Sequence, residues 1–206
     1  MTFRAVLWDF GGVLSSSPFE AFSRFEVEHG LPDGFLRRVN ATNPDTNAWA
    51  RFERNELDLD GFGDAFATES AALGHRVDGR DVLGLLAGDL RPEMIRAVRR
   101  CREHGLLTAL LTNNVVAMDG WEAGVALGEL FDLVVESSKA GVRKPEPAAY
   151  ELVLAELGVA AEEVVFLDDL GINLKPARAM GMTTVKVSDP QQALSELESA
   201  LGLPLR

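Results

Sequence analysis

The sequence has a single cysteine, Cys101, and three histidines among its 206 residues. One cysteine excludes an internal disulfide and a cysteine-rich metal centre. The histidines are scattered along the chain, and no two of them have the spacing of a metal-binding pair. Catalytic or metal-binding chemistry is therefore expected from carboxylates, amides, hydroxyls and lysines.

Long hydrophobic runs are also absent. No apolar stretch approaches the roughly 18 residues that a membrane span requires, and the short apolar stretch near the N-terminus ends in Asp9, which is typical of a strand rather than a signal peptide. Cations are the minority: 20 Lys and Arg against 32 Asp and Glu give a net charge of −12. Such a chain repels nucleic acid and anionic membranes. We expect a cytoplasmic protein with neither as a partner, and the sequence defines no oligomeric state.

The length and composition are those of a globular protein of one fold, with 47% apolar and 25% charged residues. Short apolar runs without alternation predict strands buried on both faces of a parallel sheet. These runs are 5–8, 106–111, 133–135, 164–167 and 183–187. From about residue 91 onward, segments with a helical pattern lie between these apolar runs. The helical segments have Pro near the start and Gly after the end. This alternation predicts a doubly wound, Rossmann-like α/β sheet.

Residues 16–90 interrupt the alternation. They contain seven of the eleven phenylalanines and no convincing strand. Helical patterns cover 18–29, 33–40, 46–54, 60–73 and 79–87. We therefore predict an all-helical subdomain at 16–90, inserted into an α/β core formed by 1–15 and 91–206.

Polar side chains follow the predicted strands. Asp9 follows the first strand, Thr112 and Asn113 follow the second, and Asp168 and Asp169 follow the fourth. Parallel sheets bind ligands outside the carboxyl ends of their strands, so these side chains are expected to converge. Each acid alone could instead cap the next helix, but carboxylates together suit Mg²⁺, which usually binds beside a substrate phosphate. The set favours a metal and phosphate site.

Lys144 stands just ahead of a predicted helix, within 141–147. A lysine there can neutralise a carboxylate or a phosphoryl oxygen, helped by the helix N-terminus. A solvated loop lysine is the alternative interpretation, and Lys139 is a competitor for the role.

These motifs and their order resemble the haloacid dehalogenase (HAD) superfamily over essentially the whole chain. The matching segments are 6–14 with Asp9 at the nucleophile position, 111–113, Lys144 within 143–147, and 166–169. The helical insert between the first two motifs is similar to the cap of one HAD subclass. The stretch 166–182 is similar to the N-terminal phosphatase domain of soluble epoxide hydrolases.

The resemblance implies a Mg²⁺-dependent phosphatase for a small phosphorylated metabolite. Asp9 would form an aspartyl-phosphate that water hydrolyses. Thr112, Asn113 and Lys144 would bind and neutralise the transferring phosphoryl group. The implied metal ligands are Asp9, the backbone carbonyl of Gly11, Asp169 and Asp168, the last as a ligand or directly behind the ligands.

One position departs from the family pattern. Phosphatases of this family usually carry a second aspartate two residues after the nucleophile, where this chain has Gly11. That aspartate protonates the leaving alcohol and then activates water, and general acid–base catalysis is worth roughly 100- to 10,000-fold. The missing acid could be borrowed from the insert, where the candidates are Glu20, Glu53, Glu56 and Asp58, although a solvated helix or turn acid is the favoured interpretation of each. Trp49 and Phe52 either line a substrate pocket or, as we rather expect, pack in the core of the insert, and Trp121 is a candidate for the border of the pocket entrance.

Three interpretations of Gly11 stay open. The chain is a phosphatase that uses good leaving groups, such as acyl phosphates, or an acid from the insert. Alternatively, it is a catalytically weak protein that binds a phosphorylated ligand or has a regulatory role. The third interpretation is a carbon–halogen hydrolase, which needs no leaving-group proton. Haloacid dehalogenases usually carry Tyr at this position and need no metal, so the pair Asp168–Asp169 argues against this last interpretation.

Overall fold

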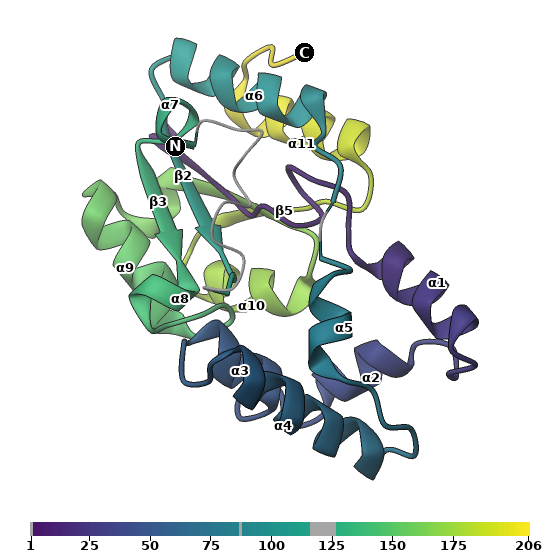
Figure 1. Ribbon diagram of the computed structural model, residues 1–206. Helices are drawn as coiled ribbons and strands as arrows, with labels where there is room; N and C mark the ends of the chain where they lie inside the picture. The colour runs from purple at the N-terminus through teal and green to yellow at the C-terminus, as the bar shows by residue number, and fades with distance from the viewer. Residues whose placement is uncertain (1, 87, 116–126) are drawn as a thin grey trace.

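Five parallel strands form one sheet in the order β3-β2-β1-β4-β5 in the computed structural model of the chain (Figure 1). The structure describes residues 2–86, 88–115 and 127–206. The strands are β1 (Ala5–Trp8), β2 (Leu107–Thr112), β3 (Leu133–Glu136), β4 (Val164–Asp168) and β5 (Thr183–Lys186). The first strand of the chain lies at the centre, and the strand order reverses between β1 and β4. The doubly wound parallel sheet predicted from the sequence is confirmed.

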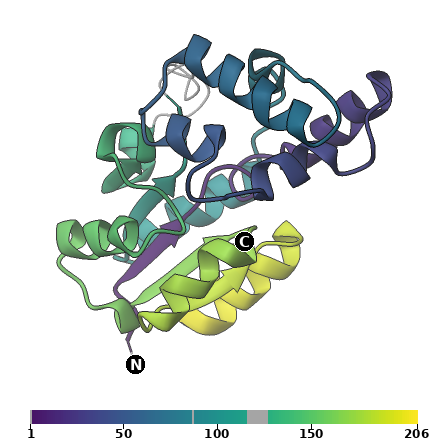
Figure 2. The ribbon, with the colours of Figure 1, turned by 90° about the horizontal axis from the view of Figure 1, so that it is seen from below.

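Helices cover both faces of this sheet (Figures 1 and 2). They are α6 (Pro92–Glu103) and α11 (Pro190–Leu201) on one face, and α9 (Pro147–Leu157) and α10 (Gly171–Ala179) on the other. Successive residues of a strand point to opposite faces. Accordingly, Val6 and Trp8 are buried with the α6–α11 side, whereas Leu7 is buried with the α9–α10 side. Both faces are apolar, which explains why the strands lack alternation.

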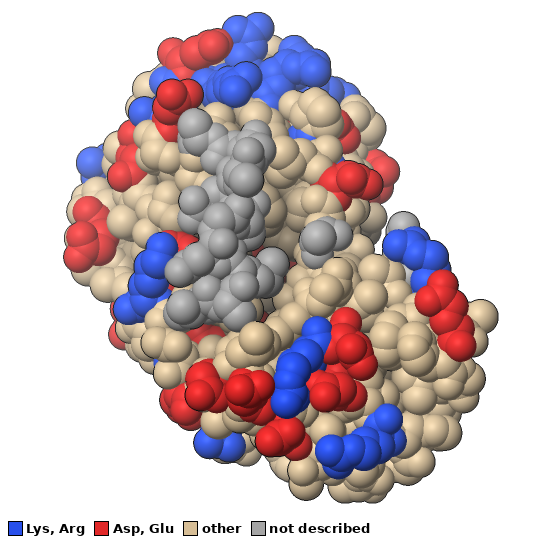
Figure 3. All heavy atoms as spheres, in the orientation of Figure 1, with Lys and Arg blue, Asp and Glu red and all other residues tan. Residues whose placement is uncertain are grey.

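Helix α6 shows how the charge pattern agrees with the fold. Its buried residues include Met94, Val98 and Cys101, on one helical face. Its opposite face carries exposed arginines such as Arg96 and Arg99, and Figure 3 shows Lys and Arg gathered over this helix. Cys101 thus lies in the core, where burial raises the pKa of its thiol to about 12.

The helices predicted between β1 and α6 are present. They are α1 (Phe19–Glu28), α2 (Phe35–Ala41), α3 (Ala48–Glu53), α4 (Leu59–Ala72) and α5 (Gly79–Leu83). We call these helices and their connections the helical insert. Two single-turn helices, α7 (Leu127–Leu130) and α8 (Ser137–Ala140), flank β3. Within the described ranges, no helix has the length and apolar character needed to cross a membrane.

The helical insert has an aromatic core of its own, separate from the two clusters that cover the sheet. Phe62 is fully buried at its centre. Its ring stacks on Phe52 at a centroid distance of 4.4 Å and meets Trp49 edge-on at 5.2 Å. The phenylalanines of this part of the sequence are therefore a packing core, which lets the insert keep its shape beside the sheet.

The helical insert leaves and rejoins the sheet region through two adjacent antiparallel segments. The Ser16 amide donates to the Asp89 carbonyl at 2.8 Å, and the Arg91 amide donates to the Leu14 carbonyl at 2.8 Å. An isolated bridge joins Ser15 to Leu90 between them. We propose this junction as the boundary between a core of residues 1–15 and 91–206 and a cap of residues 16–90.

Replacing Phe62 by alanine tests the aromatic core. Because the ring is fully buried among other rings, Phe62→Ala is expected to lower the free energy of unfolding by about 3–5 kcal/mol. Val27→Ala is the matched control: Val27 is 82% exposed, so a change within about 0.5 kcal/mol is expected. Urea titration measures both, and equal losses would contradict the assignment of Phe62 to the core.

Candidate active site

A buried lysine lies between two carboxylates at the carboxyl ends of β1 and β4. The Lys144 ammonium is 2.7 Å from Asp9 Oδ1 and 2.8 Å from Asp168 Oδ2. Lys144 is 1% exposed, Asp168 0% and Asp9 8%. Burial opposes the charged form of Lys144, but the charges of Asp168 and Asp9 outweigh it and raise the pKa of this lysine. The three groups therefore form one ionic cluster, in which the lysine stays protonated.

Asp168 is fixed from behind by further hydrogen bonds. Its carboxylate accepts from the Leu170 amide at 2.8 Å and from Asn173 Nδ2 at 3.1 Å. The Tyr150 hydroxyl in turn donates to the Asn173 carbonyl at 2.7 Å. Every oxygen of Asp168 thus has a donor, so this residue holds Lys144 in place.

Asp9, Asp168 and Asp169 offer carboxylate oxygens that all lie within 4.8 Å of one another. Burial is the main cause that raises the pKa of Asp9 well above its usual range. Burial and then the charge of Asp168 raise the pKa of Asp169 to about 6. Three close carboxylates outnumber the one lysine among them, and a hard divalent cation with oxygen ligands fits this donor set.

The turn after β1 approaches Asp169 too closely for any residue but glycine. Gly12 has φ +76°, a conformation that other residues rarely adopt. A Cβ atom on Gly12 would lie 2.3 Å from Asp169 Oδ2. Gly11, which precedes it, has no atom within 4 Å of the position of a Cβ, so its surroundings are open.

Thr112 and Asn113 follow β2, as the sequence predicts, but their side chains have different surroundings. Thr112 is 5% exposed and lines the same cavity as Asp9. The Asn113 carboxamide instead binds the Lys144 main chain, accepting from its amide at 2.9 Å and donating to its carbonyl at 2.9 Å. Asn113 therefore positions the residue that carries the buried ammonium, and direct phosphoryl binding by its side chain stays a prediction.

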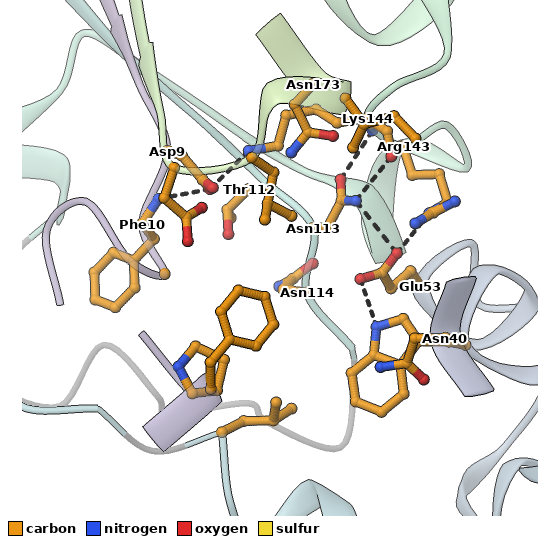
Figure 4. Close-up of a pocket in the computed structure, with 18 of the residues that line it drawn as sticks. Asp9, Phe10, Asn40, Glu53, Thr112, Asn113, Asn114, Arg143, Lys144 and Asn173 are labelled. Atoms are coloured by element: carbon orange, nitrogen blue, oxygen red, sulfur yellow. Dashed lines mark hydrogen bonds and ion pairs between the residues drawn. The ribbon is translucent and has the colours of Figure 1, made fainter. Parts of the chain in front are cut away.

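Glu53 connects the helical insert to this arrangement (Figure 4). Its carboxylate accepts from Arg143 Nε, from Trp49 Nε1 at 2.9 Å and from Asn113 Nδ2 at 3.2 Å. Burial raises the pKa of Glu53, and the Arg143 charge partly offsets that rise. From the sequence we consider Glu53 only as a possible proton donor and assign no role to Arg143. Nothing in the residue spacing links Glu53 with Arg143, because the two lie far apart in the chain.

The other acids considered in the insert have structural partners or are not described. Glu56 is exposed and pairs with Arg54 at 2.6 Å. Asp58 caps α4 by accepting from the Gly61 amide at 2.8 Å. The side chain of Glu20 is not among those described. The competing lysine, Lys139, lies on α8, pairs with Glu136 at the end of β3 and is 61% exposed, so Lys144 alone of the two is in the acidic cluster.

A cavity of about 950 Å³ lies between these polar groups and the helical insert. Asp9, Thr112, Lys144 and Asp169 line one part of it. The insert and its connections line another part with Phe19, Phe22, Trp49, Leu86 and Leu90. The interpretation of Trp49 as a pocket residue agrees with this cavity, whereas Phe52 packs inside the aromatic core. Trp121 lies outside the described residues.

The chain belongs to the haloacid dehalogenase-like hydrolases, since the model of that family matches residues 3–181. It is 36% identical over 210 residues to acyl-CoA dehydrogenase family member 10 of Mus musculus, covering 99% of this chain and 20% of that protein. It is 31% identical over 225 residues to bifunctional epoxide hydrolase 2 of Sus scrofa, covering 100% and 40%. This chain therefore spans less than half the length of both relatives.

A relative of similar length is the sesquiterpene phosphatase astK of Aspergillus oryzae, 28% identical over 205 residues with 98% of both chains covered. Among solved structures, L-2-haloacid dehalogenase of Xanthobacter autotrophicus has a TM-score of 0.63, 23% identity, and 99% and 86% coverage. A HAD family enzyme of Bacteroides thetaiotaomicron, in complex with magnesium and inorganic phosphate, has a TM-score of 0.62, 20% identity, and 89% and 93% coverage. These structures share the fold.

The raised pKa of Asp169 predicts a pH-dependent stability of the metal-free protein. A carboxyl group whose pKa rises from 3.8 to about 6 on folding binds its proton more tightly in the folded state. The contribution of this group to the free energy of unfolding is therefore fully present below about pH 4 and is lost as the pH rises through about 6. With a chelator present, Asp169→Asn is expected to raise the free energy of unfolding by about 1–2 kcal/mol at neutral pH and by much less near pH 4.

Urea unfolding at the two pH values measures this difference. The same variant titrated with Mg²⁺ provides the control, because losing a carboxylate ligand is expected to reduce the stabilisation by the ion. A gain from Asp169→Asn that is equal at both pH values would contradict the account of this carboxyl group.

Proposed function

We propose that this HAD-like hydrolase is a Mg²⁺-dependent phosphatase that transfers the phosphoryl group of a small phosphorylated metabolite to Asp9. The observation that carries the proposal is the position of Asp9: it lines the cavity, touches the Lys144 ammonium, and lies beside two further carboxylates. The similarity to a sesquiterpene phosphatase over nearly the full length of both chains supports this choice.

Asp9 is oriented as a nucleophile should be. Its Oδ1 accepts from the Phe10 amide at 2.7 Å and contacts Lys144, whereas Oδ2 accepts no hydrogen bond from the described residues. Oδ2 attacks phosphorus, a bond forms to Asp9, and the ester oxygen leaves with the bonding electron pair. Water then attacks the same phosphorus, the bond between phosphorus and Asp9 Oδ2 breaks, and the carboxylate is freed while the protons of the water leave on the released phosphate.

The remaining groups neutralise and position the phosphoryl group. Lys144 keeps its charge beside the attacked phosphorus, and the Thr112 hydroxyl can donate to a phosphoryl oxygen. We propose that Mg²⁺ is held by Asp9, the carbonyl of Gly11 and Asp169, with Asp168 directly behind. When bound, the ion supplies Lewis-acid stabilisation of the phosphoryl charge.

Gly11 limits the substrates that such a site can process. Glu53 is the acid of the helical insert among the described residues that line the cavity, and it is already bound by Arg143 and Asn113, so it is not available to replace the missing aspartate. Leaving groups that depart without a proton, such as the carboxylate of an acyl phosphate, are therefore favoured. The aromatic wall of the cavity favours a substrate with an apolar body.

A second candidate is a protein that binds a phosphorylated ligand with little turnover. Gly11 favours it specifically, because the general acid–base group is missing while Thr112 and Lys144, which we propose bind the phosphate, line the cavity. The carbon–halogen hydrolase has less support, since the carboxylates of Asp168 and Asp169 lie together with that of Asp9. We propose the cytoplasm as the location and a small phosphorylated molecule as the partner.

Replacing the nucleophile tests the proposal directly. Asp9→Asn is expected to reduce the hydrolysis of acetyl phosphate by at least about a thousandfold, because an amide cannot form the phosphoryl intermediate. A chelator should reduce the wild-type rate to a similar extent, and Mg²⁺ should restore it. Phosphate release measures both, and full activity of Asp9→Asn would exclude Asp9 as nucleophile.

Restoring the missing acid tests the role of Gly11. No atom lies within 4 Å of a Cβ at this position, so Gly11→Asp can be accommodated. We expect it to accelerate alkyl phosphate hydrolysis by about tenfold or more, and acetyl phosphate hydrolysis by a smaller factor, because activation of water is common to both substrates whereas only the alkoxide also needs a proton to leave. Gly11→Asn is the matched control, since it adds the same bulk without a transferable proton. Equal acceleration by both variants would contradict the explanation.

A further inference from the structure

One cation of the cavity has no acidic partner among the described residues. Arg37, Arg143 and Lys144 all line the cavity. Lys144 is paired with two carboxylates and Arg143 with Glu53. The Arg37 guanidinium instead lies 4.0 Å from the ring centroid of Phe19, with no salt bridge to any described acid. In a chain of net charge −12, an arginine unpaired in this way is available to a negatively charged ligand.

Asn40 provides a second polar group beside Arg37. The two residues lie three positions apart on α2, so they share one face of that helix, and both line the cavity. The Asn40 carboxamide forms no hydrogen bond with the described residues, and its oxygen is buried without a partner. Figure 4 shows Asn40 across the cavity from Asp9. The far wall of the cavity therefore carries a guanidinium without a salt bridge and an amide without a hydrogen bond to any residue that the structure describes.

Apolar side chains line the cavity together with these polar groups. Phe10, Phe22, Leu86 and Leu90 line the same cavity. A ligand that fills the cavity also contacts these apolar side chains, which cannot satisfy buried polar groups, so an apolar body is favoured. The cavity volume of about 950 Å³ is enough for a metabolite larger than a simple acyl phosphate.

We propose that Arg37 and Asn40 form a second, distal subsite that binds a carboxylate of the substrate. The substrate is then a phosphorylated carboxylic acid with an apolar body, its phosphate at Asp9 and its carboxylate at α2. This assignment rests on the proposed function for the position of the phosphate. The planar guanidinium matches a carboxylate with two parallel hydrogen bonds, and the Asn40 amide can donate a further one.

The test measures binding, so it does not depend on turnover. Two series of ligands with increasing chain length are compared in the presence of Mg²⁺: alkylphosphonates, and phosphonocarboxylates that carry a carboxylate at the other end. We expect the phosphonocarboxylate of the matching length to bind about fivefold more tightly at low salt, as an exposed ion pair with hydrogen bonds allows. Arg37→Gln should abolish this preference, with dissociation constants measured by calorimetry.

Arg38→Gln is the matched control. Arg38 is the next residue of α2, but its guanidinium lies over Phe35 and it does not line the cavity, so this variant should keep the preference. Equal binding of the two series by the wild type, no binding of either, or a loss of preference in Arg38→Gln would overturn the subsite. Tighter binding of bisphosphonates than of phosphonocarboxylates would overturn the carboxylate assignment. Acetyl phosphate turnover, measured separately, reports on the proposed function itself.

Discussion

The salt bridges of one buried ammonium with two buried carboxylates are the interaction on which the candidate site depends. Asp9 follows β1, Asp168 ends β4, and Lys144 lies in the loop before α9, so three distant segments must meet. Removing one member would leave a buried charge without its partner, which is strongly destabilising. The strand order satisfies this requirement, because β1 pairs directly with β4 and their polar ends lie at the same edge of the sheet.

The surroundings of this cluster divide the cavity into a polar end held by hydrogen bonds and an end lined by the helical insert. At the polar end, Asn113 binds the main chain of Lys144, and Asn173 binds Asp168. At the other end, the walls come from the helical insert, whose aromatic core is distinct from the clusters that cover the sheet and is joined by Val115, just after β2. Glu53 and Arg143 join the two ends. Such a division lets one chemical mechanism serve different substrates, since the insert can change while the charge cluster stays the same.

The sheet and the acidic cluster were predictable because both follow from local patterns. Each buried strand is a short apolar run, and the polar residue that ends it lies at the carboxyl edge, as Asp9 and Asp168 do. The link from Glu53 to Arg143 was not predictable, because it joins residues 90 positions apart and depends on how the helical insert docks. The binding of Asn113 to the Lys144 main chain likewise depends on tertiary structure. A motif identifies which residues lie near the site, but not which of them contact each other.

The central claim is that the Asp9 carboxylate carries the phosphoryl group during turnover. Acid quenching of a single turnover with acetyl phosphate and Mg²⁺, followed by mass spectrometry of the peptides, tests this claim most directly. The account predicts that the peptide containing Asp9 gains the mass of one phosphoryl group, with fragmentation that locates the group on Asp9. Substrate consumption with no phosphorylated peptide, or a phosphoryl group on another residue, would contradict it.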